Sequence, residues 1–115
     1  MNKEIKQTDI VIVGAGPSGC MAASILVDSG RSVILLDKND FPRHKPCAGG
    51  LTPKTVEELP FEITDLKQHD SETMLFKFTN GKTVDLNNES GACKMVVREE
   101  FDEFFFNYVV GKGVE

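Results

Sequence analysis

The 115-residue sequence lacks the features that mark several large classes of protein. It has no excess of basic residues, because 13 lysines and arginines face 18 acidic residues, so nucleic-acid binding is a poor first expectation. No apolar run approaches the roughly 18–20 residues that span a bilayer. The polar segment 1–9 does not have the basic-then-apolar layout of a signal peptide. We therefore expect a cytoplasmic protein with no transmembrane segment.

Cysteine is also scarce, and Cys20, Cys47 and Cys93 have no close spacing. Isolated cysteines in odd number argue against a disulfide framework and against a zinc knuckle. The pattern fits a reducing cytoplasm, and we expect no metal site. The hydrophobic fraction of 40% and the charged fraction of 27% are those of an ordinary globular chain of one domain at most.

The first 37 residues predict one βαβ unit. Residues 10–13 form a continuous β-branched run, typical of a parallel strand that is buried on both faces. Residues 20–29 have helical spacing, and Gly30 follows where a helix end favours a left-handed residue. A second apolar run, 33–36, ends at Asp37. Strand, helix and strand in this order predict a right-handed crossover.

Three glycines between the first strand and the helix match the dinucleotide fingerprint, Gly14-x-Gly16-x-x-Gly19. Gly14 would allow the tight turn, Gly16 would let a pyrophosphate approach the backbone, and Gly19 would let helix and strand pack closely. Unpaired N–H groups of the helix N-terminus would face the phosphates. The alternative is a glycine-rich turn without a ligand.

Asp37 sharpens the expectation, because a carboxylate there can accept hydrogen bonds from a ribose diol. It would repel a 2′-phosphate, so the adenine half of NADP is disfavoured. FAD and NAD both carry a free diol, and the fingerprint does not separate them.

The rest of the chain predicts a mixture of loop, hairpin and helix. Residues 38–60 are expected to be loop with one short helix after Thr52-Pro53, and 62–70 has no clear pattern. Residues 73–86 predict an antiparallel hairpin around a type I′ turn at Asn80-Gly81.

A short strand at 94–97 and a helix at 98–110 with Gly111 as its C-cap are expected next. Val114-Glu115 has the pattern of a further strand that has only begun. A parallel sheet this small has little core and open edges, so we expect the chain to be the N-terminal part of a longer protein.

Arg98 stands at a strand-to-helix junction, where a cation opposes the helix dipole at a cost of roughly 0.3–1 kcal/mol. An anion of a cofactor would offset that cost, so we expect Arg98 to reach toward the cofactor. The alternative is a surface pair with Asp102 one helical turn further on.

Cys47 is the one candidate for a catalytic group. It lies in the segment 38–54, which carries four basic residues against one acidic residue, and neighbouring cations lower a thiol pKa. Gly49 and Gly50 beside it would allow a flat ring to lie against the backbone. A buried small hydrophobe is the equally weighted alternative for Cys47. His44 and His69 are expected to be exposed.

Four blocks of this sequence resemble, in the same order, the geranylgeranyl reductase family. They are GAGPSG at 14–19, LDK at 36–38, KPCAGGL at 45–51 and VREEFD at 97–102. Members of that family are FAD-dependent oxidoreductases with a para-hydroxybenzoate-hydroxylase-like architecture. The resemblance implies an α/β fold: a Rossmann-like FAD-binding βαβ unit, interrupted by an antiparallel β-hairpin insertion, in an incomplete domain. About 60–92 would be the inserted segment of the substrate-binding sheet.

The resemblance also implies a cofactor site. The FAD pyrophosphate would be held by Gly14, Ala15, Gly16, Pro17, Ser18 and Gly19. The adenosine ribose would bind at Asp37, although many relatives have Glu at this position, and Lys38 is also expected to bind the cofactor. Cys47, Ala48, Gly49 and Gly50 would run beside the isoalloxazine ring, with Ala48 where the family often has Gly. Arg98 would contact FAD on the pyrophosphate side.

The implied activity is hydride delivery to an alkene of an isoprenoid or lipid-like substrate, with NAD(P)H as a possible electron donor. A lipid substrate would suggest peripheral membrane contact, whereas the oligomeric state is not indicated. The chain stops before the family's later flavin-binding motifs, so the fragment alone is expected to be inactive. The alternatives are an FAD-dependent monooxygenase or halogenase, a non-catalytic nucleotide-binding module, and a plain NAD-binding domain.

Overall fold

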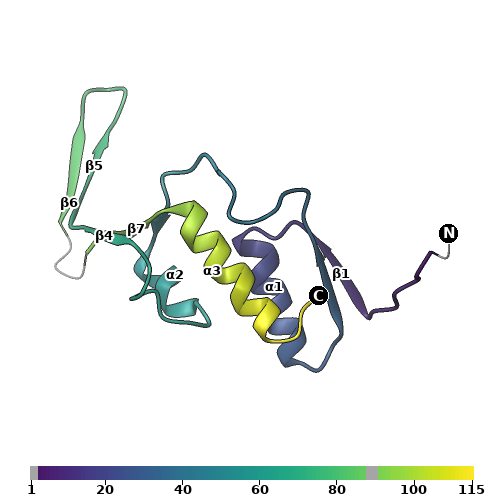
Figure 1. The fold of residues 1–115 in the computed structure, drawn as a ribbon. Helices are drawn as coiled ribbons and strands as arrows, with labels where there is room; N and C mark the ends of the chain where they lie inside the picture. The colour runs from purple at the N-terminus through teal and green to yellow at the C-terminus, as the bar shows by residue number, and fades with distance from the viewer. Residues whose placement is uncertain (1–2, 88–90) are drawn as a thin grey trace. The chain divides into compact units, whose positions relative to one another are not determined.

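The computed structural model describes residues 3–87 and 91–115, whose helices and strands are drawn in Figure 1. The chain divides into two compact units. The first unit comprises Met1–Arg43 together with Asp102–Glu115, and the second comprises His44–Phe101. Among the described helices, none combines the length and the apolar character that a membrane span requires.

The first unit contains the predicted βαβ arrangement. Strand β1 (Ile10–Val13) pairs in parallel with β2 (Val33–Leu36), and helix α1 (Pro17–Asp28) connects them and packs against both. The helix begins three residues earlier than its apolar spacing indicates, because Gly16 is the N-cap and Pro17 takes the first helical position. Proline is well tolerated there, since its missing N–H would have no intrahelical partner.

The strands of this small sheet are buried on one face and exposed on the other. Val33 and Leu35 are buried, whereas Val13 is 83% exposed and Leu36 is 50% exposed. The expectation that both faces are buried is therefore wrong for the described chain. Side chains of a strand alternate between its faces, and α1 covers the face to which Val33 and Leu35 belong.

The end of the chain returns to this sheet. The Leu35 amide donates to the Glu115 carbonyl at 2.7 Å, and the Glu115 amide donates to the Val33 carbonyl at 3.1 Å. One residue that bonds to two alternate residues of its neighbour is the pattern of a parallel pair. No strand is assigned to 114–115, but these two bonds to β2 agree with the predicted start of one.

Helix α3 (Arg98–Gly111) precedes residues 114–115 and passes from the second unit into the first. The predicted C-cap at Gly111 is wrong, because Gly113 takes the left-handed position, with φ +101°. The Gly113 amide bonds to Val110 and the Val114 amide bonds to Val109, which is the Schellman pattern. Val109 and Val114 are both buried and supply its apolar contact.

The second unit contains a three-stranded antiparallel sheet in the order β3-β7-β4. Its strands are β3 (Gly50–Leu51), β4 (Gln68–Ser71) and β7 (Cys93–Val96). Strand β7 lies one residue earlier than predicted, and β3 falls in the predicted loop. The short helix α2 (Pro53–Glu58) contacts β7, and Thr52 caps it by accepting from the Thr55 amide, as its sequence indicates.

Strands β5 (Thr73–Lys77) and β6 (Thr83–Asn87) form the predicted hairpin as a separate two-stranded sheet. The turn is not of type I′, which needs a positive φ at both Asn80 and Gly81. Only Gly81 has a positive φ, at +82°, and its amide donates to the Phe78 carbonyl at 3.0 Å. This is a type I turn followed by a glycine bulge, the usual three-residue hairpin connection.

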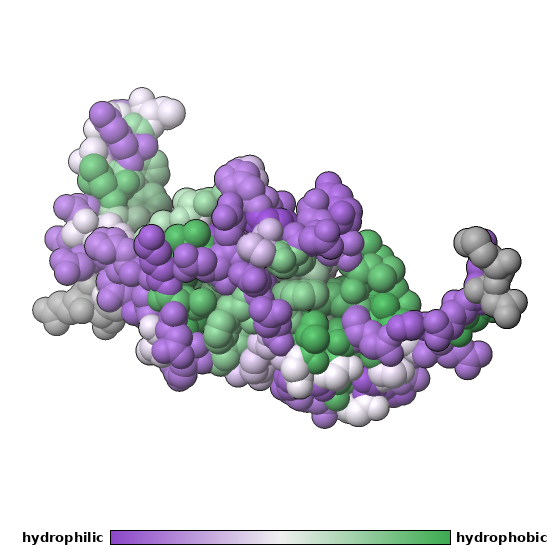
Figure 2. Space-filling model, in the orientation of Figure 1, coloured by the Kyte–Doolittle hydropathy of each residue, from purple (hydrophilic) through white to green (hydrophobic). Residues whose placement is uncertain are grey.

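One face of the hairpin is apolar. The cross-strand pairs Met74–Leu86 and Phe76–Val84 lie on it, whereas Leu75–Asp85 occupies the other face. Hydrophobic colouring covers much of the hairpin surface in Figure 2, and Phe76, Val84 and Leu86 are all exposed.

The close packing of Gly49 against β7 in the second unit can be tested by substitution. Gly49 has φ +75°, and a Cβ on it would overlap the Val96 carbonyl oxygen. We expect Gly49→Ala to lower the free energy of unfolding by more than about 1 kcal/mol, the usual penalty for a side chain in the left-handed region. Gly50→Ala is the control, because its methyl would make ordinary contacts at 3.6 Å. Urea denaturation of the full-length variants measures both; equal losses would contradict this packing.

Candidate functional site

The turn between β1 and α1 is held in shape by its own backbone. Gly14 has φ +107°, a conformation that side chains disfavour, and its amide donates to the Leu36 carbonyl at 2.6 Å. A Cβ on Gly19 would overlap the Gly14 carbonyl oxygen. Gly14 is therefore needed for the backbone conformation of the turn, and Gly19 is needed for the close approach of α1 to that turn. Both roles are those that the fingerprint predicts.

Asp37 fixes this turn from the neighbouring strand. Its Oδ2 accepts a hydrogen bond from the Ala15 amide at 2.8 Å, and its Oδ1 accepts one from the Asn39 amide at 2.9 Å. The acid that ends β2 therefore faces the glycine turn.

These backbone bonds, that of Ala15 first, lower the pKa of Asp37 below its ordinary value of 3.8. The carboxylate is therefore charged at neutral pH. Because the folded-state pKa is depressed, its stabilising effect is complete above the unfolded value and is lost as pH falls through the folded value.

Gly16 differs from the other two glycines, because neither its backbone angles nor its packing requires a glycine. It has ordinary backbone angles, and the nearest heavy atom to a Cβ built on it is Arg43 Nη2, at 3.7 Å. It caps α1 without a side chain, and the first turn of α1 contains no acidic residue. The amides that begin a helix, here from Ser18 on, lack intrahelical partners and favour anions. A backbone cradle with a helix N-terminus behind it fits the diphosphate of a dinucleotide.

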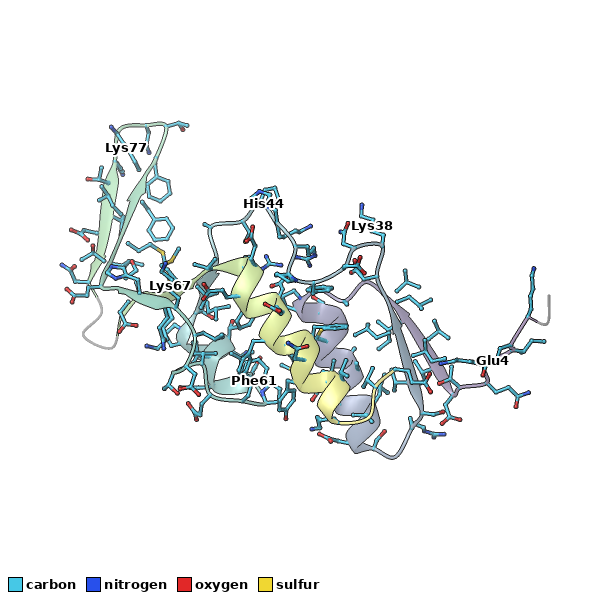
Figure 3. The ribbon with its side chains drawn as sticks, in the orientation of Figure 1. Glu4, Lys38, His44, Phe61, Lys67 and Lys77 are labelled. Atoms are coloured by element: carbon cyan, nitrogen blue, oxygen red, sulfur yellow. The ribbon has the colours of Figure 1, made fainter. Side chains whose placement is uncertain are left out.

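The remaining predicted residues around this turn divide into buried and exposed ones. Ala15 is buried, and its amide is engaged by Asp37, so that N–H is not available to a phosphate. Pro17 begins α1 and Ser18 is exposed beside it. Lys38 is exposed, and its side chain extends outward from the loop after β2 in Figure 3.

Cys20 lies beneath the turn as a structural thiol. It is fully buried, and its Sγ lies 3.3 Å from the Ala15 carbonyl oxygen, to which it donates. Burial raises the pKa of Cys20 to about 11, and the negative charges of Asp102 and Asp37 add to the effect. The thiol is thus neutral at physiological pH and has no nucleophilic character there.

The predicted ring-side block lies in the second unit. Cys47 is exposed, which removes the alternative of a buried hydrophobe, and its Sγ accepts from the Gly49 amide at 3.4 Å. Ala48 is exposed, Gly49 is buried against Val96, and Gly50 belongs to β3. The glycine at position 49 is thus explained by the packing of this unit itself.

The two histidines and Arg98 also belong to the second unit. His44 and His69 are both exposed, as expected, and His44 Nδ1 lies 3.2 Å from Glu99 Oε1. Arg98 is the first residue of α3, in accordance with its predicted junction. Its contact with a cofactor remains a prediction.

Sequence reasoning missed a buried ion pair in the first unit. Arg43 Nη1 lies 2.9 Å from Asp102 Oδ2, and the Asp102 side chain is fully buried. From the sequence we considered Arg98 as the partner of Asp102, because the two residues are spaced one helical turn apart and spacing along a helix was the only guide to a contact. The one signal in the sequence was their position relative to the four blocks: Asp102 ends VREEFD, and Arg43 lies two residues before KPCAGGL.

A comparison with known sequences identifies what the turn belongs to. The profile of the family described as "FAD binding domain" matches residues 7–95. The chain belongs to this FAD binding domain family. The match includes β1, the glycine turn, α1 and β2, so the groups that fit a dinucleotide diphosphate are those of an FAD-binding domain.

Curated relatives match this FAD-binding domain along nearly its whole length. It is 37% identical to an uncharacterised protein of Methanosarcina barkeri over 95% of the chain. It is 34% identical to geranylgeranyl diphosphate reductase of Rhodobacter capsulatus over 93% of the chain, which confirms the resemblance seen in the four blocks. It is 30% identical to the flavin-dependent halogenase armH2 of Armillaria mellea over 94% of the chain. The chain spans 28%, 27% and 23% of these proteins, respectively.

A solved flavoprotein/dehydrogenase from Cytophaga hutchinsonii has the same fold. Its TM-score is 0.72 at 25% identity, over 96% of this chain and 29% of that one. The α/β class and the FAD-binding architecture are thereby shown for this FAD-binding domain.

The different roles of Gly16 and Gly19 in the turn can be tested by substitution. We expect Gly19→Ala to destabilise the protein by more than about 2 kcal/mol, because its methyl has no space against the Gly14 carbonyl. Gly16→Ala should cost less than about 1 kcal/mol, the usual effect of losing a glycine N-cap, yet it should weaken FAD binding. Thermal unfolding of the apoprotein and FAD titration separate the two effects. Equal stability of both variants would contradict the account of the turn.

Proposed function

We propose that the complete protein is an FAD-dependent oxidoreductase of the geranylgeranyl reductase type, which reduces alkene bonds of an isoprenoid or lipid-like substrate. The observation that carries the proposal is the glycine turn held by Asp37, in which neither backbone angles nor packing requires the glycine at position 16. The relative of R. capsulatus, named for geranylgeranyl diphosphate, supports the substrate class.

In this proposal the residues of the chain bind and orient the cofactor. Gly16 and the first amides of α1 would hold the diphosphate, and Asp37, already ionised, would accept from the adenosine ribose. The segment 47–50 would lie beside the isoalloxazine ring, and Arg98 would contact the pyrophosphate side. FAD, when bound, would supply the hydride for the alkene, with NAD(P)H as the proposed source of electrons.

The hairpin would contribute to substrate binding. We place the segment of about 60–92, of which 88–90 lie outside the described residues, in the substrate-binding sheet of the complete domain. The apolar face built from the pairs Met74–Leu86 and Phe76–Val84 supports this, because an isoprenoid chain requires an apolar surface. A lipid-like substrate would bring a cytoplasmic protein into peripheral contact with a membrane.

A flavin-dependent halogenase is the second candidate, favoured by the 30% identity to the A. mellea protein. The residues described so far serve FAD binding in either case. The two functions therefore differ in what the complete protein does with the substrate.

The test uses purified full-length protein. We expect bound flavin in its visible spectrum, and with geranylgeranyl diphosphate and NADPH under anaerobic conditions we expect products that have gained two hydrogens per reduced alkene. Free FAD with NADPH is the control. A halogenated or hydroxylated product formed only with oxygen would support the second candidate and contradict the first. A colourless protein that FAD does not reconstitute would contradict both and support a non-catalytic nucleotide-binding module.

A further inference from the structure

A buried charged pair lies in the first unit without a role in the site proposed above. Arg43 Nη1 is 2.9 Å from Asp102 Oδ2, and the two side chains are only 11% and 0% exposed. A buried ion pair adds little to the free energy of unfolding, because the cost of removing both charges from water offsets most of their attraction. The position of this pair therefore calls for another explanation.

Aromatic rings fix the direction of the guanidinium. Arg43 Cζ lies 4.8 Å from the centre of the Phe41 ring, in a cation–π contact. Phe41 in turn stacks on Phe106 of α3, with ring centres 4.9 Å apart and planes inclined by 3°. The planar group is thus held by a carboxylate on one side and a ring on another.

The guanidinium lies next to the glycine turn. Its Nη2 is 3.7 Å from the position that a Cβ on Gly16 would occupy, so the space beside Gly16 is lined by an arginine donor. Nη1 is buried, and within the described residues it has no acceptor in hydrogen-bond geometry despite its nearness to Asp102. Arg43 Nη2 thus presents a donor next to the backbone cradle for a diphosphate, while Nη1 faces Asp102.

The chemistry of arginine suits that ligand. Its planar fork donates parallel hydrogen bonds to phosphate oxygens and stays charged at any physiological pH. Asp102, which is buried, offsets the cost of placing that charge inside the protein and keeps the fork at the turn.

We propose that Arg43 binds the cofactor diphosphate at the Gly16 turn and that Asp102 is a positioning residue that holds Arg43 there. The inference rests on the proposed FAD site and adds two residues to it. It gives the aspartate of the VREEFD block a role separate from that of Arg98: it joins α3 to the loop after β2 through Arg43.

The test compares a ligand with a diphosphate to one without it. ADP and adenosine are titrated into deflavinated full-length protein, as wild type, Arg43→Lys, Asp102→Asn and the double variant Arg43→Met/Asp102→Asn. The double variant leaves no unpaired buried charge, so its fold should persist. We expect the Arg43→Met/Asp102→Asn variant to lose about tenfold or more in ADP affinity, as for a charged hydrogen bond, and to bind adenosine within about twofold of wild type. Asp102→Asn and Arg43→Lys should show smaller losses, again for ADP only.

Lys112→Met is the matched control, because it breaks another ion pair of the first unit, Lys112–Asp28 at 2.6 Å. Asp28 ends α1, at the opposite end of the helix from Gly16. The ADP affinity of the Lys112→Met variant should equal that of wild type. ADP affinity unchanged in the double variant, or equal losses for ADP and adenosine, would overturn the inference. If the double variant does not fold, Arg43→Lys decides by the same comparison. Wild-type protein that binds neither FAD nor ADP would instead reject the proposed function.

Discussion

The hydrogen bond from the Ala15 amide to the Asp37 carboxylate is the contact on which the site depends. It joins the carboxyl end of β2 to the turn that follows β1, and it does so with a group that is charged at neutral pH. One carboxylate therefore serves two purposes in our account, because it shapes the phosphate-binding turn and is placed for the ribose of the same ligand. Carboxylate oxygens can accept several hydrogen bonds, so the two purposes are compatible.

Glycine occurs at positions 16, 19 and 49 for different structural reasons. Gly19 and Gly49 are required by intramolecular packing, since a side chain on either would overlap a backbone carbonyl. Gly16 has ordinary backbone angles, and a Cβ on it would make only an ordinary contact with Arg43 Nη2 at 3.7 Å, so nothing in the fold of the described residues demands a glycine there. A ligand that approaches the backbone explains Gly16 where packing does not.

Local patterns allowed the nucleotide-binding part to be predicted from the sequence. The runs 10–13 and 33–36 became β1 and β2, and the spacing of the three glycines gave correct roles for Gly14 and Gly19. Strand β4 could not be predicted, because Gln68–Ser71 is polar, and it pairs with β7 through backbone hydrogen bonds and the Asp70–Lys94 ion pair. The turn type at Gly81 and the helix end at Gly113 were not predicted correctly. The sequence permits several geometries at each place, and the hydrogen bonds of the folded chain select one of them. The Arg43–Asp102 pair joins residues far apart in the chain, and no periodicity indicates such a contact.

The most direct measurement of this account is the dissociation constant of FAD from full-length protein carrying Asp37→Asn, at neutral pH. The variant keeps the size of the side chain and removes the charge that holds the turn and that we propose accepts from the ribose. The account predicts affinity at least about tenfold weaker than wild type, as expected for a charged hydrogen bond. Asp9→Asn should bind FAD as wild type does, because Asp9 accepts from the Ser32 amide at the opposite ends of the same strands. FAD affinity within about twofold of wild type for Asp37→Asn, by the same conversion, would contradict the central claim.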